Sequence, residues 1–195
     1  MDLLKQALST NTKTVLDDIP EGKKLLKILT YPNPKLRGIS APIPKDANQE
    51  NINNLVSLMR YAMEFYGGVG LAAPQVGVHY RLLLVSRQTA HNAQGVDGPL
   101  TMLNPEIVHL EGTQSAPEGC LSFPGIRAAH VLRGETVIVQ FEDLERKHNE
   151  LELTGFQAQI VQHEIDHLNG ILFIDKVSRL KKDMILQRYK KTGRL

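Results

Sequence analysis

The sequence QHEIDH, residues 162–167, lies in a segment whose apolar residues recur at helical spacing between residues 155 and 168. On such a helix His163 and His167 are four residues apart and share one face, close enough to hold one metal ion. Glu164 can then reach a water on that metal without binding the metal itself. Two solvent-facing histidines on an ordinary helix are the alternative, but the polar residues here interrupt the apolar stripe, which favours a site.

A catalytic site of this kind needs a third protein ligand and an open fourth position. No glutamate follows Glu164 and no histidine follows His167, so the usual downstream ligand of a zinc protease is missing. The other downstream candidates are three aspartates in no convincing context: Asp166, Asp175 and Asp183. Upstream, the segment EGCLS, residues 118–122, holds Cys120, the only thiol of the chain. A lone cysteine is more typical of a small buried residue, yet a thiolate with two imidazoles would suit Fe(II) or Zn(II).

A third unusual segment is GVGLAAPQVG, residues 68–77. It is a weak phosphate-binding candidate, because it lacks the Lys-Ser/Thr pair and precedes a strand rather than a helix. Its small residues instead indicate backbone held close to another group, and Gln75 offers an amide donor. The alternative is a tight helix-to-strand turn with incidental glycines.

Composition excludes several classes of protein. A chain of 195 residues with 42% hydrophobic content can bury a substantial core, and a net charge of +2 gives no general argument for a nucleic-acid partner. One cysteine permits no intrachain disulfide. We see neither a secretory signal nor an apolar run that could span a membrane, and therefore expect a cytoplasmic protein with no membrane partner.

Periodicity elsewhere predicts both helices and strands. Helical spacing predicts helices over residues 51–65 and 179–191, the second capped by Ser178. Apolar runs predict strands over residues 81–86 and 136–141. Strands and helices do not alternate regularly, so the predicted class is α+β, with mostly antiparallel sheets around a central helix that carries the histidines, and a C-terminal helix.

The other segments are predicted to be short or irregular. Prolines make residues 30–45 extended or turn-forming, residues 3–8 could form one short amphipathic helix, and residues 90–99 form a loop. We predict one domain, residues 1–195, with an N-terminal extension over residues 1–24 and a basic C-terminal helix over residues 179–195.

Taken together, residues 68–75, 118–122 and 162–167 closely resemble the three signature motifs of the peptide deformylases, in the family's order and approximate spacing. The segment from Ile28 to Arg37 is also similar to the family's N-terminal region, so the resemblance spans residues 25 to about 180. Departures are the extra N-terminal residues and two positions that bear on side-chain preference, where smaller or more aliphatic residues are common: Phe156 and Gln159.

The resemblance implies a metal-dependent hydrolase that removes the formyl group from the N-terminal formyl-methionine of new proteins and releases formate. It implies that Cys120, His163 and His167 hold one divalent metal, with a water in the fourth position. The implied native metal is Fe(II), which Zn(II), Ni(II) or Co(II) can replace.

The resemblance also implies roles for the residues around the metal. Glu164 would act as general acid and base, while the Gln75 side-chain amide and the Leu121 backbone N–H would stabilise the developing oxyanion. The peptide would bind as an added strand with its methionine in an apolar pocket, and Arg127 at the pocket mouth would pair with Glu118. The residues expected to bind the peptide are Val69, Gly70, Glu118, Gly119, Arg127, Phe156 and Ile160.

Other interpretations stay open at this stage. An HExxH-type metallopeptidase would cleave internal peptide bonds, and a non-catalytic metal-binding module would show no turnover. The last helix has seven basic residues over positions 179–194 and one acid, Asp183. This pattern fits a solvated face, or transient docking on the ribosome, where new peptides emerge. The sequence leaves the oligomeric state undetermined.

Overall fold

The computed structural model describes residues 16–18, 24–86 and 99–192. Its main sheet has five antiparallel strands in the order β3-β4-β5-β8-β9. These strands are β3 (Gly70–Ala72), β4 (Leu82–Val85), β5 (Leu100–Glu111), β8 (Thr136–Glu142) and β9 (His148–Thr154). Two antiparallel hairpins accompany this sheet: β1 (Leu16–Asp18) with β2 (Lys24–Leu26), and β6 (Gln114–Gly119) with β7 (Arg127–Arg133).

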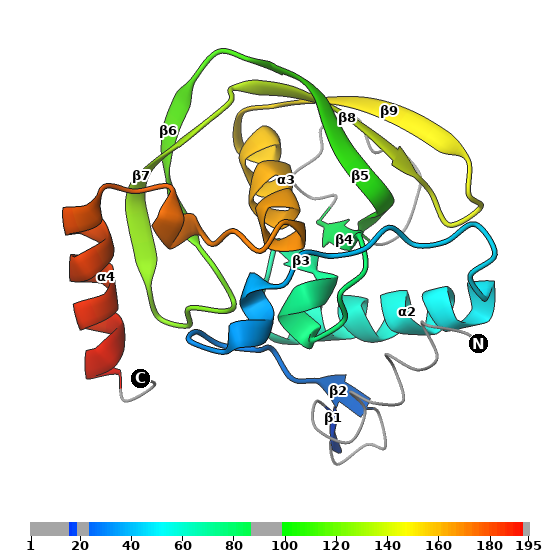
Figure 1. The fold of residues 1–195 in the computed structure, drawn as a ribbon, viewed down its shortest axis with the longest axis horizontal. Helices are drawn as coiled ribbons and strands as arrows, with labels where there is room; N and C mark the ends of the chain where they lie inside the picture. Colours follow the sequence, from blue (N-terminus) through cyan, green and yellow to red (C-terminus); the bar gives the residue numbers. More distant parts are fainter. Residues whose placement is uncertain (1–15, 19–23, 87–98, 193–195) are drawn as a thin grey trace.

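Three α-helices complete the described fold. They are α2 (Gln49–Phe65), α3 (Gly155–Leu168) and α4 (Arg179–Lys191), with short 3-10 turns η1 (Pro34–Arg37), η2 (Ala73–Val76) and η4 (Phe173–Asp175). The long strands β5, β8 and β9 arch over α3, and the β6–β7 hairpin lies on its other side (Figure 1). The predicted α+β class with a central and a C-terminal helix is confirmed.

Helix α3 is the centre of the molecule. Every residue from Ala158 to Leu168 is buried, so even its polar residues lie inside the protein. The helix contacts β3, β4, β7, β8 and β9, and packs its apolar residues with those of the main sheet in one core cluster. The histidines are therefore fixed by packing on several sides, as a pre-organised site requires.

A second core cluster attaches α4 to the β6–β7 hairpin. Tyr189 is fully buried, and its ring centroid lies 5.3 Å from that of Phe123 in the loop that follows β6. Ile185 and Ile126 belong to the same cluster. Only Ile185 and Tyr189 of α4 are buried, so this helix packs through one narrow stripe.

The helix predictions hold closely. The predicted limits of α3 and α4 are confirmed, and the Ser178 side chain accepts a hydrogen bond from the Lys181 N–H at 3.4 Å. Helix α2 begins two residues earlier than predicted, because Asn48 caps it by accepting a hydrogen bond from the Asn51 N–H. No helix in the described parts of the chain is long and apolar enough to cross a membrane.

The strand predictions were incomplete. The predicted strands near β4 and β8 are confirmed, but β1, β2, β3, β5, β6, β7 and β9 were not predicted. Strand β5 contains Pro105 and has register irregularities against β8, which obscure its alternation in the sequence. The predictions for residues 3–8 and most of residues 90–99 lie outside the described residues.

Candidate active site

The structure brings the three predicted metal ligands together. Cys120 follows the end of β6, while His163 and His167 lie one turn apart on α3. One ligand atom from each of these side chains lies within 4.8 Å of the other two. The Cys120 Sγ and the His167 Nε2 are 3.2 Å apart. This spacing is short enough for one ion to contact all three atoms.

The chemistry of this donor set fits a divalent transition metal. The His163 Nδ1 lies 2.8 Å from the Glu118 Oε2, which leaves its other ring nitrogen for a metal. Burial lowers the pKa of His167 well below its ordinary value, so this ring is neutral at pH 7, as a ligand must be. Burial opposes protonation of His163 as well, but hydrogen bonds with Cys120 and Glu118 raise its pKa. A metal bound here would therefore displace a proton.

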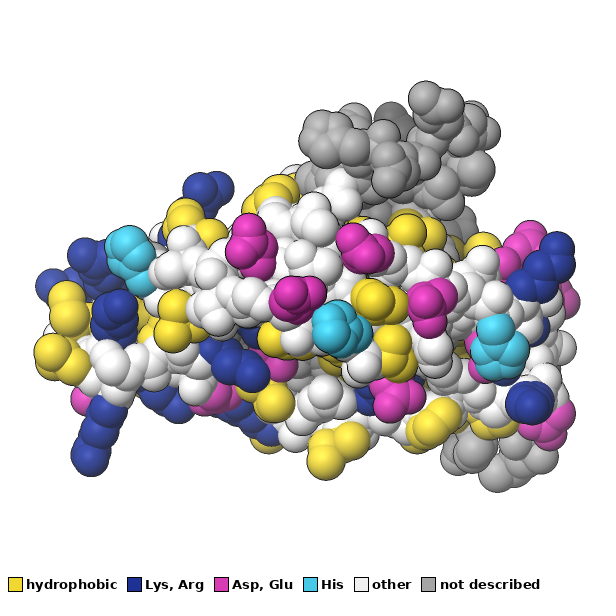
Figure 2. All heavy atoms as spheres, turned by 90° about the horizontal axis from the view of Figure 1, so that it is seen from above, with side chains coloured by type: hydrophobic (Ala, Val, Ile, Leu, Met, Phe, Trp, Pro, Cys, Tyr) yellow, Lys and Arg dark blue, Asp and Glu magenta, His cyan; other side chains and the backbone are white. Residues whose placement is uncertain are grey.

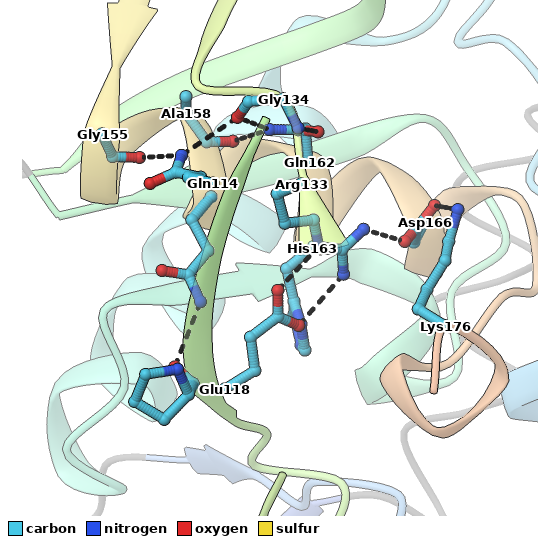
Figure 3. A network of polar contacts seen from close by, with 12 residues as sticks. Gln114, Glu118, Arg133, Gly134, Gly155, Ala158, Gln162, His163, Asp166 and Lys176 are labelled. Atoms are coloured by element: carbon cyan, nitrogen blue, oxygen red, sulfur yellow. Dashed lines mark hydrogen bonds and ion pairs between the residues drawn. The ribbon is translucent and has the colours of Figure 1, made fainter. Parts of the chain in front are cut away.

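A buried ionic network holds Glu118 in place (Figure 3). Arg133, at the end of β7, is only 6% exposed and donates to both Glu118 oxygens, at 2.6 and 3.0 Å. Its remaining nitrogen donates to Asp166, which also lies 3.5 Å from the Lys176 Nζ. Burial alone would raise the pKa of Glu118, but hydrogen bonds from His163 and Arg133 lower it to about 2. Glu118 is thus an ionised acceptor for His163, and Asp166 belongs to this network rather than to the ligand set.

The predicted pair between Arg127 and Glu118 is wrong. Strand register places Arg127 opposite Gly119, and Glu118 opposite Ala128. Because neighbouring residues on a strand point to opposite faces, Glu118 faces the interior, where Arg133 meets it, while Arg127 is exposed. The sequence did not reveal this, because Arg133 ends an apolar strand and resembles a solvated residue.

Glu164 is the one acid beside the ligand cluster that lacks a full set of partners. It is 4% exposed, and its Oε2 has no hydrogen-bond partner among the described residues. Burial raises the pKa of Glu164 to about 7. A carboxyl with such a pKa and an unfilled acceptor is suited to exchange a proton with a water near neutral pH.

The structure explains why glycine occurs at two positions of the segment 68–77. A Cβ at Gly70 would lie 2.4 Å from the Glu164 Oε1, so only glycine lets this carboxylate rest against β3. A Cβ at Gly68 would lie 2.8 Å from the Leu121 Cδ1. The prediction that small residues here allow close approach is confirmed at these two positions, and Gly70, which meets three atoms of the buried Glu164, argues most strongly against incidental glycines.

Gln75 directs its amide toward the ligand cluster. Its Oε1 accepts a hydrogen bond from the Ala72 N–H at 2.8 Å, which fixes the orientation of the amide. Its Nε2 donates to the Ser122 Oγ at 3.3 Å and lies 3.6 Å from the Cys120 Sγ. The amide N–H₂ is therefore held beside Cys120, a member of the ligand cluster.

One cleft of about 830 Å³ collects residues from all three motifs. Every residue predicted to bind the peptide lines it, as do Cys120, Leu121, Gln75, His163 and Glu164. Phe156 and Val69 are 54% and 43% exposed at its rim, while Ile160 is buried deeper. Gln159 donates to the Pro117 carbonyl at 3.1 Å, so its amide ties α3 to β6.

Residues 25–183 match the family model of the polypeptide deformylases. The chain belongs to the peptide deformylase family. It is 39% identical to the peptide deformylase of Acidobacterium capsulatum over 167 residues, 86% of this chain and 95% of that protein. It is 41% identical to that of Hydrogenovibrio crunogenus over 166 residues, 85% of this chain and 94% of that protein.

Solved deformylases share the fold. The crystal structure of a peptide deformylase from Legionella pneumophila superposes with a TM-score of 0.78 at 37% identity, covering 87% of this chain and 96% of that one. The predicted family and enzyme class are confirmed, and the deformylase motifs are those that converge on the cleft.

Three residues at this site were not predicted from the sequence. Arg133 supports Glu118 from β7. Gln162 fastens α3 to Gly134, the residue after β7, by accepting from its N–H at 2.9 Å and donating to its carbonyl at 3.0 Å. The position of Gln162 inside the apolar stripe could have indicated its role. A residue in that stripe is expected to be buried, and a buried amide needs hydrogen-bond partners. Arg188 of α4, which also lines the cleft, gave no signal of a site in the sequence.

Proposed function

We propose that this cleft is where the enzyme hydrolyses the formyl amide of an N-terminal formyl-methionine and releases formate. Cys120, His163 and His167 would hold one divalent metal, which when bound supplies Lewis-acid chemistry and an acidified water. Glu164 would accept a proton from that water at its free Oε2 and return it to the departing amine. This unpartnered carboxylate oxygen beside a three-ligand cluster is the observation that carries the proposal.

Two donors would stabilise the substrate oxygen as it becomes anionic. Gln75 is oriented by Ala72 and presents its Nε2 near Cys120, and the Leu121 N–H follows directly after that ligand. Such donors are effective because they are fixed before the reaction and excluded from bulk water.

The peptide would bind as a sixth strand beside β3. This strand is an edge of the main sheet, and the Val69 carbonyl already accepts a hydrogen bond from the Ser86 N–H on its sheet side. Gly70 of β3 and Gly119 of β6 both line the cleft, and an extended peptide backbone would lie between them. Val69, Phe156 and Ile160 would surround the methionine side chain.

The first test is formate release from formyl-Met-Ala-Ser under anaerobic conditions with added Fe(II). We expect activity in the wild type and a loss of roughly 10²- to 10⁴-fold in Glu164→Ala with metal still bound. Cleavage of unformylated peptides instead would indicate a metallopeptidase. Bound metal without turnover of either substrate would indicate a non-catalytic module.

Fe(II) is the proposed native metal, with Zn(II), Ni(II) or Co(II) as substitutes. The mixed thiolate and imidazole set permits all four ions. The ferrous enzyme should lose activity in air through oxidation of the iron and Cys120, and Ni(II) substitution should slow that loss. Activity of the ferrous form that is fully stable in aerated buffer would contradict the assignment.

We further propose a single-domain cytoplasmic enzyme that meets new peptides at the ribosome. Many Lys and Arg side chains gather at the end of the molecule where α4 lies (Figure 2). Because Ile185 and Tyr189 of α4 are buried, removal of the helix would damage the core. The test is therefore Lys181→Glu with Lys190→Glu, which should reduce co-sedimentation with ribosomes; unchanged co-sedimentation would contradict docking.

A further inference from the structure

The outer part of the cleft carries two exposed arginines, Arg127 and Arg188. Among the described residues, the only acids that line the cleft are Glu118 and Glu164, and each is 4% exposed. Glu118 is already engaged by Arg133 and His163. In the part of the chain that the structure describes, the solvent-facing part of the cleft therefore has positive charge without a compensating acid.

The fold fixes the backbone positions of both arginines. Arg188 comes one residue before Tyr189, whose buried ring anchors α4 against Phe123. Arg127 begins β7 opposite Gly119, and a Cβ at Gly119 would lie 3.7 Å from the Arg127 Cγ. In Figure 1, α4 and β7 lie next to each other at one side of the molecule. The two arginines thus approach one cleft from two different elements.

Neither guanidinium is paired with an acid of the described ranges. Among the described residues, no carboxylate oxygen lies within 4.0 Å of the Arg127 or Arg188 nitrogens, although other arginines of the protein form such pairs. Asp183, the one acid of α4, is exposed and five residues from Arg188, a spacing that does not bring side chains together on a helix. Both arginines can therefore attract a ligand's negative charge.

We propose that Arg188, together with Arg127, makes the enzyme prefer peptides with an acidic side chain among the residues that follow formyl-methionine. The inference rests on the proposed function, in which the peptide lies extended between Gly70 and Gly119. An extended peptide advances about 3.3 Å per residue and turns alternate side chains to the same wall. The proposal places the residues after methionine beside these arginines, since both are exposed residues of the lining of the same cleft.

The expected preference is modest because the rim is open to solvent. An exposed ion pair of this kind corresponds to roughly a two- to fivefold change in kcat/KM, and salt should weaken it. Arg188 is the better test of the two, since Arg127 is also expected to contact the peptide near Gly119.

The experiment compares formyl-Met-Ala-Glu-Ser-amide with formyl-Met-Ala-Gln-Ser-amide, and a second pair carries Glu or Gln at the second position. Amidation removes the C-terminal carboxylate, so only the side chain differs in charge. The measured quantity is the Glu-to-Gln ratio of kcat/KM for the Fe(II) enzyme at low salt. We expect a ratio of roughly two to five in the wild type for at least one pair, near one in Arg188→Gln, and below one in Arg188→Glu.

Lys190→Gln is the matched control. It removes the same charge from α4, but two residues along the helix its side chain points about 200° away from that of Arg188. It should keep the wild-type ratio. Equal kcat/KM for both members of each pair, or a ratio unchanged in Arg188→Gln, would overturn the inference and leave the proposed function intact. No formate from any peptide would overturn both.

Discussion

Helices α3 and α4 are similar in length and rich in polar residues, yet the protein uses them in opposite ways. Between Ala158 and Leu168, α3 buries every polar side chain, while α4 buries only Ile185 and Tyr189. The polar residues of α3 find partners on other elements: Gln162 at Gly134, His163 at Glu118, and Asp166 at Arg133. The basic residues of α4 mostly face water.

This comparison shows what makes polar residues tolerable in a core. A buried charge or amide is strongly unfavourable unless it is paired and hydrogen-bonded, and on α3 most partners come from the β6–β7 hairpin. Glu164 is the exception, since its Oε2 has no protein partner. Gln157 near the start of α3 also has an unpartnered amide nitrogen, but Glu164 is the unpartnered group that lies beside the ligand cluster, as is typical of a functional position.

Arg133→Met should have the largest effect on stability. It would remove the guanidinium that pairs with the buried Glu118 and leave Asp166 with only the more distant Lys176, a change that typically destabilises by about 3–5 kcal/mol. Urea unfolding of the variant measures this. The matched control is Lys182→Met, which breaks the half-exposed pair with Asp175 and should change stability by less than about 1 kcal/mol. Equal losses in the two variants would contradict the contrast between the helices.

Glu164→Gln should change the pH dependence of stability in the metal-free protein. Burial raises the pKa of Glu164 from 4.5 to about 7, so between these values the folded state binds more protons than the unfolded state. The stabilisation that the protonated Glu164 gives the folded state is therefore fully present below pH 4.5 and is lost as pH rises through 7. The free energy of unfolding of the wild type falls by about 3 kcal/mol in total over this range.

The glutamine variant lacks this titration. From pH 5 to pH 8, its unfolding free energy should rise relative to that of the wild type, with both proteins kept in chelator. Parallel stability curves over this range would show that Glu164 is not a destabilised buried acid.

Gly70→Ala should lower kcat strongly and change the free energy of unfolding little. The added Cβ would lie 2.4 Å from the Glu164 Oε1 and push the carboxylate out of place, and a displacement of about 1 Å can lower kcat by about 10²-fold. Metal content should not change. The control is the same substitution in a Glu164→Ala background, where it should have little further effect; additive losses would mean that Gly70 acts independently of Glu164.

Asp175→Asn should have the smallest effect. Burial alone would raise the pKa of Asp175, but hydrogen bonds from Arg37 and Lys182 lower it to about 2. This stabilisation is present above pH 4 and is lost as pH falls through 2, and because the site is partly exposed it amounts to about 1 kcal/mol. Unfolding of wild type and variant at pH 7 and pH 2.5 measures the difference, which should shrink at the lower pH. A larger stability difference between wild type and variant at pH 2.5 than at pH 7 would contradict a lowered pKa of Asp175.

Much of the site could be predicted because its signals are local. The histidine pair follows from the four-residue repeat of a helix, and the limits of α3 and α4 follow from apolar spacing and the Ser178 cap. Strand β5 could not be predicted in this way, because Pro105 and register shifts break the alternation by which a strand is recognised.

By itself, the sequence determined the motif helix, the single thiol that completes the ligand cluster, and the glycines that admit Glu164. Only the tertiary structure decided that Arg133 rather than Arg127 meets Glu118, and that Arg188 reaches the cleft from the C-terminal helix. The physical reason is that these contacts join residues far apart in the chain, and they depend on strand register and on the side of α4 that Tyr189 buries. Local periodicity contains no information about either.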